Sequence, residues 1–339
     1  MLKTKLVFCK KMPDRTKFPD SSVLFFDSIL LKKPFFKKWS QNFKCKIALK
    51  SGENLKSIDQ FKKFAELLGR KNIPQTQDLT FIAVGGGSVG DFVGFLSSVY
   101  LRGRPFIQIP STWLAAVDSA HGGKNGLNLN GKKNQIGTFY WPNSTYLIEE
   151  LLNSQPQERW KDALGEVVKI SLISSKKTFH TVTKNRNFDL FSILPKLIQM
   201  KSDIVEKDPL EKEGHRRLLN LGHTLGHVFE VNGKWSHGIS VWAGIIFSLR
   251  YSYQKGLISD QDFIEIWNGL HQLGIRNNYQ KLLQKLSLQQ VVNGLIKDKK
   301  ITKKNEIDFI FIHGLEKIKR QKVSLQDLIA EFKRQRVEI

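Results

Sequence analysis

Residues 80–95 read TFIAVGGGSVGDFVGF, and this stretch decides the fold of the first half of the chain. The apolar run Thr80–Val84 predicts a buried strand, and the residues after Asp91 predict a helix. Glycines at 85, 87 and 90 fit the pattern G-x-G-x-x-G, in which backbone N–H groups hold a pyrophosphate. The acid expected about 20 residues later to bind a ribose is missing. We predict a dinucleotide-binding loop that lacks the usual ribose-binding acid and is atypical in that respect. The alternative is a tight turn that needs glycine for its geometry alone.

Short apolar runs alternate with helical patterns over the first 150 residues, which is typical of an α/β sheet. The predicted strands are Leu6–Cys9, Val23–Phe26, Lys46–Leu49, Thr80–Val84, Phe106–Ile109 and Thr145–Ile148. Helical periodicity dominates afterwards, apart from a strand-like run at Phe309–Ile312 before a last helix at Leu325–Arg334. We therefore expect an α/β domain over residues 1–155 and a mostly α-helical domain over residues 156–339.

The chain of 339 residues has a net charge of +23, of which +10 falls on residues 1–50 and +8 on residues 271–339. The lysines are scattered among apolar residues, which favours solvated faces over a nucleic-acid surface. With 40% hydrophobic residues the chain can bury a core, and it has no apolar run of the length of a membrane span. Cys9 and Cys45 give no disulfide framework, so we expect a cytoplasmic protein.

Four polar residues, spaced four, three and four apart, predict one line along a helix: Arg216, Asn220, His223 and His227. Apolar residues occupy the other directions of this helix, so the line needs polar partners unless it faces solvent. Gly222 and Gly226 weaken a helix by about 1 kcal/mol each. Their presence suggests that another segment packs closely there.

Histidines are also concentrated here, with three between residues 223 and 237. His223 and His227, four residues apart, could reach one metal ion, although position 224 lacks the glutamate of zinc proteases. Upstream, Glu166 and Lys169 share a helix face, and His237 begins the next helical pattern. One carboxylate with two imidazoles is a ligand set of catalytic zinc, so a metal site and structural histidines both stay open.

A lysine-bearing loop lies between the last two predicted strands of the first half. His121–Gly126 reads HGGKNG, and Gly131–Asn134 reads GKKN. Lysines flanked by glycines suit a flexible clamp for an anion. Taken alone, this stretch is better interpreted as a surface turn.

Together these segments resemble the 3-dehydroquinate synthase family. The matching stretches run in family order over about residues 23–300 and are GGGSVGDFVGF (85–95), YLRGRPFIQIPST (100–112), VDSAHGGKNGLN (117–128), GKKNQIGTFYWP (131–142), GEVVK (165–169), NLGHTLGH (220–227), SHGISV (236–241) and KDKK (297–300). The resemblance implies a Rossmann-like domain that binds NAD, a helical domain that binds a divalent metal (Zn or Co), an active site between them, and a homodimer. It also implies a phosphate-eliminating lyase of the shikimate pathway, which leads to the aromatic amino acids.

The resemblance assigns roles to particular residues. The implied metal ligands are Glu166, His223 and His237, so His227 becomes a substrate contact. The implied cofactor residues are Asp27, Gly52, Glu53, Lys56, Gly86, Gly87, Ser88, Val89, Gly90, Asp91, Ser111, Thr112, Lys124 and Lys133. The implied substrate and catalytic residues are Asp118, Lys124, Asn134, Lys169, Lys201, Arg216, Asn220, His227 and either Lys299 or Lys300.

The implied reaction converts the seven-carbon phosphate DAHP to 3-dehydroquinate and phosphate by transient NAD-dependent oxidation, phosphate elimination, reduction and intramolecular aldol closure. Four positions depart from the family pattern without removing an implied metal ligand or anion-binding side chain: Ser51, His121, Asn125 and Ile239. Two related activities stay open. One is another sugar-phosphate cyclase, and the other is a metal- and NAD-dependent polyol or glycerol-phosphate dehydrogenase. Lys124, Arg216 and His227 favour a carboxylated substrate.

Overall fold

The computed structural model describes residues 4–70, 73, 78–184, 188–273, 276–297 and 306–337. The chain divides into two compact units, Met1–Trp160 and Lys161–Ile339. We expected the division after residue 155, and what each unit binds stays a prediction. Among the helices that the structure describes, none is long and apolar enough to cross a membrane.

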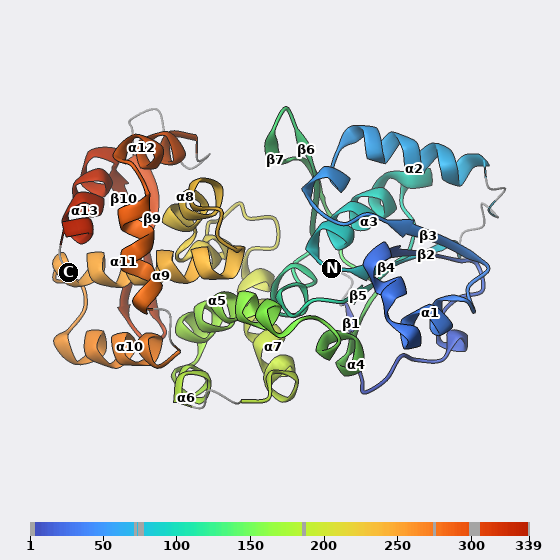
Figure 1. Ribbon diagram of the computed structural model, residues 1–339, viewed down its shortest axis with the longest axis horizontal. Helices are drawn as coiled ribbons and strands as arrows, with labels where there is room; N and C mark the ends of the chain where they lie inside the picture. The colour runs from blue at the N-terminus through green and yellow to red at the C-terminus, as the bar shows by residue number, and fades with distance from the viewer. Residues whose placement is uncertain are drawn as a thin grey trace. The chain divides into compact units, whose positions relative to one another are not determined.

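A six-stranded parallel sheet forms the centre of the first unit (Figure 1). Its strands, in spatial order, are β1 (Lys5–Cys9), β8 (Ser144–Ile148), β5 (Phe106–Pro110), β4 (Thr80–Gly85), β2 (Ser22–Asp27) and β3 (Cys45–Leu49). All six predicted strands are therefore confirmed. Every residue of β2 and β4 is buried, as expected for strands covered on both faces.

Helices cover both faces of this sheet. They are α1 (Pro34–Ser40), α2 (Ile58–Arg70), α3 (Gly87–Val99) and α4 (Glu149–Asn153), with short helical turns at Arg15–Lys17, Ser28–Lys32, Glu53–Leu55, Tyr100–Arg102 and Ala115–Ser119. Neighbouring side chains of β2 point to opposite faces, so Phe25 packs in a core with α2 and α3, while Phe26 packs in a core with α1. The predicted α/β class is confirmed.

The lysine loop is a β-hairpin, which corrects our interpretation of a surface turn. Strand β6 (Lys124–Leu129) pairs antiparallel with β7 (Lys132–Phe139). The connecting Asn130 and Gly131 have φ values of 50° and 72°. Two positive φ angles are typical of the type I′ turn that Asn-Gly favours in hairpins. The Asn-Gly pair was the signal that we missed.

The second unit is mostly helical, as predicted. Its helices are α5 (Gln157–Ser174), α6 (Lys176–Lys184), α7 (Leu190–Lys207), α8 (His223–Gly233), α9 (His237–Gln254), α10 (Asp260–Gln272), α11 (Arg276–Lys285), α12 (Leu288–Lys297) and α13 (Leu325–Val337), with a short turn η6 at Arg216–Asn220. The long helix α9 packs against α8, α10 and α13 and is buried on most of its circumference. Strands β9 (Glu306–Gly314) and β10 (Lys317–Ser324) form an antiparallel pair. The predicted strand at residues 309–312 lies inside β9, whereas β10 was missed.

Candidate metal centre and cofactor loop

Three side chains from three helices converge in the second unit. Glu166 lies on α5, His223 is the first residue of α8, and His237 is the first residue of α9. One ligand atom from each lies within 4.8 Å of the other two. Glu166 Oε1 is 3.7 Å from His223 Nε2 and 3.3 Å from His237 Nε2. One ion could therefore bridge all three side chains.

In both histidines, the ring nitrogen Nδ1 lies within hydrogen-bond distance of an acceptor. His223 Nδ1 is 3.2 Å from the carbonyl oxygen of Leu221, and His237 Nδ1 is 2.9 Å from Glu230 Oε2. A carbonyl and a carboxylate can only accept, so each Nδ1–H donates and each Nε2 faces Glu166. Metal-binding histidines commonly have this second hydrogen bond. Two imidazole nitrogens and one carboxylate oxygen form a donor set that fits a divalent metal such as zinc.

Charge reinforces this interpretation. Burial would raise the pKa of Glu166, which is only 2% exposed, but the Lys169 ammonium and the hydrogen bond from His237 lower it to about 2. Burial would lower the pKa of His237, but hydrogen bonds to Glu166 and Glu230 raise it to about 10. The cluster thus favours positive charge next to Glu166. A divalent cation would take the place of the imidazolium proton, because a ligating imidazole is neutral.

The predicted single helix through residues 216–227 is wrong. The chain forms the turn η6, and α8 begins only at His223. Gly222 between them has a φ of 78°, and a Cβ there would lie 2.5 Å from the carbonyl oxygen of Val241 on α9. The left-handed conformation of Gly222 separates η6 from α8, and α9 packs so closely against this position that only glycine fits, as the composition suggested. In this arrangement His237 joins His223 and Glu166, whereas His227 lies exposed one turn along α8.

The predicted substrate residues of the second unit include several buried cations. Lys169 pairs with Glu166, Lys201 is buried on α7, and Arg216 in η6 is 5% exposed. Buried cations need anionic or hydrogen-bonding partners, and Lys169 has one in Glu166 and Arg216 one in the carbonyl oxygen of Pro209. Asn220 ends η6. Lys299 and Lys300 lie outside the described residues.

The glycine loop of the first unit joins β4 to α3, as predicted. A Cβ on Gly85 would lie 2.5 Å from Val89 Cβ, and one on Gly90 would lie 2.3 Å from Gln108 Nε2. Gly85 is therefore needed for packing whether or not a phosphate binds, whereas at Gly90 the flexible Gln108 side chain would have to move. The loop also places the first turn of α3, Gly87–Asp91, at the carboxyl end of β4, where helix N–H groups can hold an anion.

Two further predicted groups lie around this loop. Gly52 N donates to Ser88 Oγ at 3.0 Å. The buried Lys56 Nζ donates to Asp91 Oδ2 at 2.7 Å and to Asn134 Oδ1 at 2.5 Å. Burial raises the pKa of Asp91, and the Lys56 ammonium opposes that shift. Lys56 thus ties the helix start to the β6–β7 hairpin.

The remaining predicted residues of the first unit range from buried to exposed. Asp27 at the end of β2 accepts a hydrogen bond from Ile29 N at 3.2 Å, and Glu53 accepts one from Asn128 at 2.7 Å. A Cβ on Gly86 would lie 3.3 Å from Thr112 Cγ2, so Thr112 is next to the glycine loop. Ser111 is buried beside β4, Asp118 is partly buried in the turn Ala115–Ser119, and Lys124 and Lys133 are exposed on the hairpin.

Two departures from the family pattern have structural roles. His121 is buried, and its Nε2 lies 2.9 Å from the carbonyl oxygen of Ala116. Asn125 donates to the carbonyl oxygens of Gly123 and Tyr140 at 3.0 and 2.8 Å. Both side chains stabilise the hairpin and the turn before it. Nothing in the structure explains Ile239.

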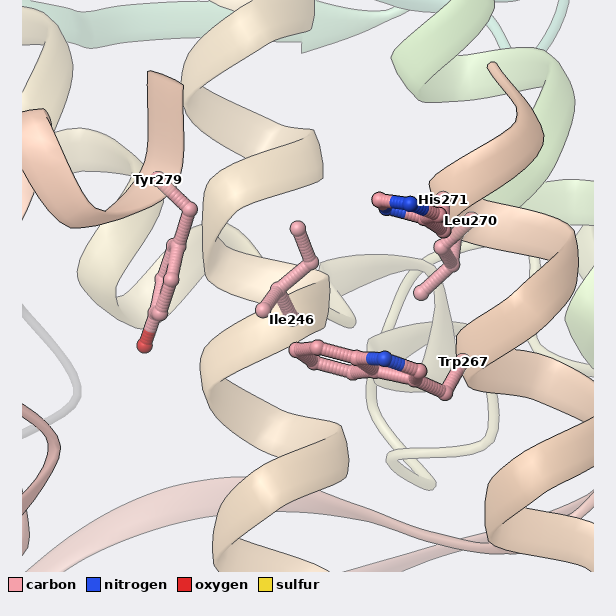
Figure 2. Close-up of a pocket in the computed structure, with 5 residues that line it drawn as sticks. All are labelled: Ile246, Trp267, Leu270, His271 and Tyr279. Carbon is pink, nitrogen blue, oxygen red and sulfur yellow. The ribbon is translucent and has the colours of Figure 1, made fainter. Parts of the chain in front are cut away.

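A separate small pocket lies between helices α9, α10 and α11. It is lined by Ile246, Trp267, Leu270, His271 and Tyr279, and Figure 2 shows Ile246 between Tyr279 and the side chains of α10. None of the predicted site residues lines it. The pocket is a seam between packed helices.

Comparison with known proteins identifies the family. A family model described as 3-dehydroquinate synthase N-terminal matches residues 46–162, and one described as 3-dehydroquinate synthase C-terminal matches residues 163–301. The 3-dehydroquinate synthase of Coxiella burnetii (strain CbuK_Q154) is 34% identical over 273 residues, which cover 77% of this chain and 74% of the relative. The chain belongs to the 3-dehydroquinate synthase family.

Solved structures support the same fold for this member of the 3-dehydroquinate synthase family. A 2-deoxy-scyllo-inosose synthase, complexed with carbaglucose-6-phosphate, NAD⁺ and Co²⁺, has a TM-score of 0.77 at 21% identity and covers 97% of this chain and 96% of its own. ValA, a 2-epi-5-epi-valiolone synthase from Streptomyces hygroscopicus with NAD⁺ and Zn²⁺ bound, has a TM-score of 0.79 at 17% identity over 100% of this chain and 98% of its own. The predicted fold class is confirmed.

Glu230 is the residue of the candidate metal centre that sequence reasoning missed. Its carboxylate holds His237 from a position seven residues away in the chain. The connection between α8 and α9 returns the chain so that the end of one helix faces the start of the next. A lone glutamate after HTLGHVF (223–229) carries no spacing signal of its own, so only the fold could assign it this contact.

Proposed function

We propose that this chain is a 3-dehydroquinate synthase that converts DAHP to 3-dehydroquinate and phosphate. The observation that carries the proposal is the convergence of Glu166, His223 and His237 in a chain that matches both models of this family. The donor set suits a divalent metal, and the glycine loop suits a dinucleotide. When bound, NAD would accept and return a hydride, and the metal would polarise hydroxyl oxygens of the substrate.

The residues of the second unit would bind and orient the substrate. Lys169, Lys201 and Arg216 are buried cations, which suit the phosphate and carboxylate of DAHP. Asn220 and His227 supply further hydrogen-bonding groups. Holding a flexible seven-carbon chain at several points favours one conformation for phosphate loss and ring closure. Lys169 also keeps Glu166 ionised, so that its carboxylate remains available to a cation.

The first unit would hold the cofactor. Backbone N–H groups of Gly87–Asp91 would face the pyrophosphate, and the segment Gly52–Lys56 lies against them through Ser88 and Asp91. Asp27 lies at the carboxyl end of β2, and Ser111 and Thr112 follow the carboxyl end of β5. Strand β4, which carries the glycine loop, lies between these two strands, and α/β sheets bind nucleotides at the carboxyl ends of their strands. Asn134 is bonded to Lys56, so a substrate contact by Asn134 would be coupled to the cofactor segment.

Another sugar-phosphate cyclase is the second candidate, because such enzymes share the fold. The identity of 34% with named 3-dehydroquinate synthases, against 21% or less with the inosose and valiolone synthases above, favours DAHP. Lys124, Arg216 and His227 favour the same choice, since they suit a substrate with a carboxylate. A homodimer and a cytoplasmic location are also proposed, the first from the family resemblance and the second from the cysteine usage.

Phosphate release from DAHP tests the proposal. With NAD and Zn²⁺ present, we expect phosphate and 3-dehydroquinate to form in equal amounts without accumulation of NADH. Chelation and His223→Ala should each abolish turnover. His271→Ala, an exposed histidine on α10, is the matched control and should leave turnover unchanged. Full activity after complete chelation would contradict the metal assignment, and stoichiometric NADH would indicate a dehydrogenase instead.

A further inference from the structure

A single carboxylate organises the turn between α7 and η6. Asp208 directly follows α7 and is 2% exposed. Its Oδ1 accepts from Lys212 N at 2.8 Å and from Glu213 N at 3.2 Å, and its Oδ2 accepts from Gly214 N at 2.8 Å and Arg216 N at 3.2 Å. Burial would raise the pKa of this carboxyl, but the four backbone hydrogen bonds lower it. The charged carboxylate thus satisfies four N–H groups of one turn.

The same turn fixes the Arg216 side chain. Arg216 Nη1 donates to the carbonyl oxygen of Pro209 at 2.8 Å, at the opposite end of the turn. Both the backbone and the guanidinium of Arg216 are therefore held by the segment that Asp208 closes. The neighbouring Arg217 is bound elsewhere, since its Nη1 donates to Asp308 on β9 at 3.0 Å. Of the two consecutive arginines, only Arg216 is buried and held within the turn.

We propose that Asp208 is a positioning residue for substrate binding, because it fixes the turn that places the Arg216 guanidinium against an anionic group of the substrate. The inference rests on the proposed function, which assigns Arg216 to the substrate. Asp208 does not itself contact substrate in this account. It also lies outside the cluster of Glu166, His223 and His237.

Asp208→Asn is the informative change, because the side chain keeps its size. One carboxylate oxygen becomes an NH₂ group, which faces backbone donors and cannot accept from them. Hydrogen bonds to charged groups contribute enough that we expect the KM for DAHP to rise by about tenfold or more. The kcat should change by less than about threefold, and Zn content and NAD affinity should stay at wild-type values. Glu206→Gln removes an exposed charge two residues away and should have no effect.

A double-mutant cycle separates positioning from a general structural role. In an Arg216→Ala background, Asp208→Asn should change KM by less than about twofold, because the group that it positions is gone. If Asp208→Asn raised KM by the same factor in the wild-type and the Arg216→Ala backgrounds, the inference would be overturned. Loss of Zn or NAD binding in the Asp208→Asn single variant would overturn it as well. If D208N does not fold, Asp208→Glu is measured in the same cycle, and an unchanged KM there overturns the inference. Failure of the wild-type protein to release phosphate from DAHP would refute the proposed function, whereas an additive cycle in an active enzyme would refute only the role of Asp208.

Discussion

Replacing Gly165 by alanine should separate two of the predicted metal ligands. Gly165 on α5 precedes Glu166, and it lies against Gly238 on α9, which follows His237. A Cβ on Gly165 would lie 2.1 Å from the carbonyl oxygen of Gly238, and contacts below 3.0 Å are essentially never seen. The two helices must therefore move apart locally by at least 0.9 Å, the difference between these values.

This displacement is large for a metal site. Metal–ligand distances hold to within about 0.2 Å of their ideal values, so a shift several times larger weakens or removes one ligand. We expect the affinity for Zn²⁺ to fall at least about 100-fold, which corresponds to about 2.7 kcal/mol. Overpacking should also reduce the free energy of unfolding by about 1–3 kcal/mol.

Competition with a chromophoric chelator measures the Zn²⁺ affinity, and urea unfolding of the metal-free protein measures the stability. Gly69→Ala is the matched control, because Gly69 lies in helix α2 and a Cβ there meets nothing within 4 Å. This control should keep the wild-type affinity and gain at most about 1 kcal/mol of stability. A folded G165A variant with wild-type Zn²⁺ affinity would refute the argument that α5 and α9 hold Glu166 and His237 on one ion.

Three further changes test other parts of the molecule. Glu230→Gln should lower Zn²⁺ affinity by about 10- to 100-fold in the same competition assay, because the carboxylate that orients His237 is lost; unchanged affinity would contradict this. Lys56→Met should weaken NAD binding, measured by calorimetry, and should reduce the free energy of unfolding by about 1–3 kcal/mol, because the partly buried Asp91 loses its cation. Burial lowers the pKa of His313, so the unfolded chain binds its proton more readily and stability falls as the pH drops through about 6.5. His313→Gln should flatten this loss in urea titrations between pH 5 and 7, and an unaltered slope would contradict the assignment.

The sequence predicts the central sheet well, because strands that are buried on both faces have a recognisable apolar pattern. Strands such as β2 and β4 are continuous apolar runs, so their pattern needs no tertiary information. The β6–β7 and β9–β10 pairs are different. Most of the residues of β7 and β10 are exposed, and strands such as Lys317–Ser324 are mainly polar. A pattern based on apolar residues could not find them, although Asn130-Gly131 marked one hairpin.

The candidate site is predicted less completely, because several of its contacts depend on how helices approach each other. A regular helix predicts His223 and His227 side by side, and their ring centroids do lie 5.4 Å apart on α8. The third member of the cluster with His223 and Glu166 is nevertheless His237, which the start of α9 supplies. Resemblance to the family was needed to choose His237 from the sequence. Glu230 and Asp208 carry no local signal, since each acts on a group seven or eight residues away through a turn of the chain.

The basic ends of the chain have a structural explanation that needs no nucleic acid. β1 and β3 are the two edges of the six-stranded sheet, and Lys5 and Lys46 are exposed on them. β10 carries a row of exposed cations as well: Lys317, Lys319, Arg320 and Lys322. Charged side chains on edge strands oppose pairing with the strands of another molecule. The excess charge at both ends of the sequence thus lies partly on exposed strands, where it would protect the fold from edge-to-edge association.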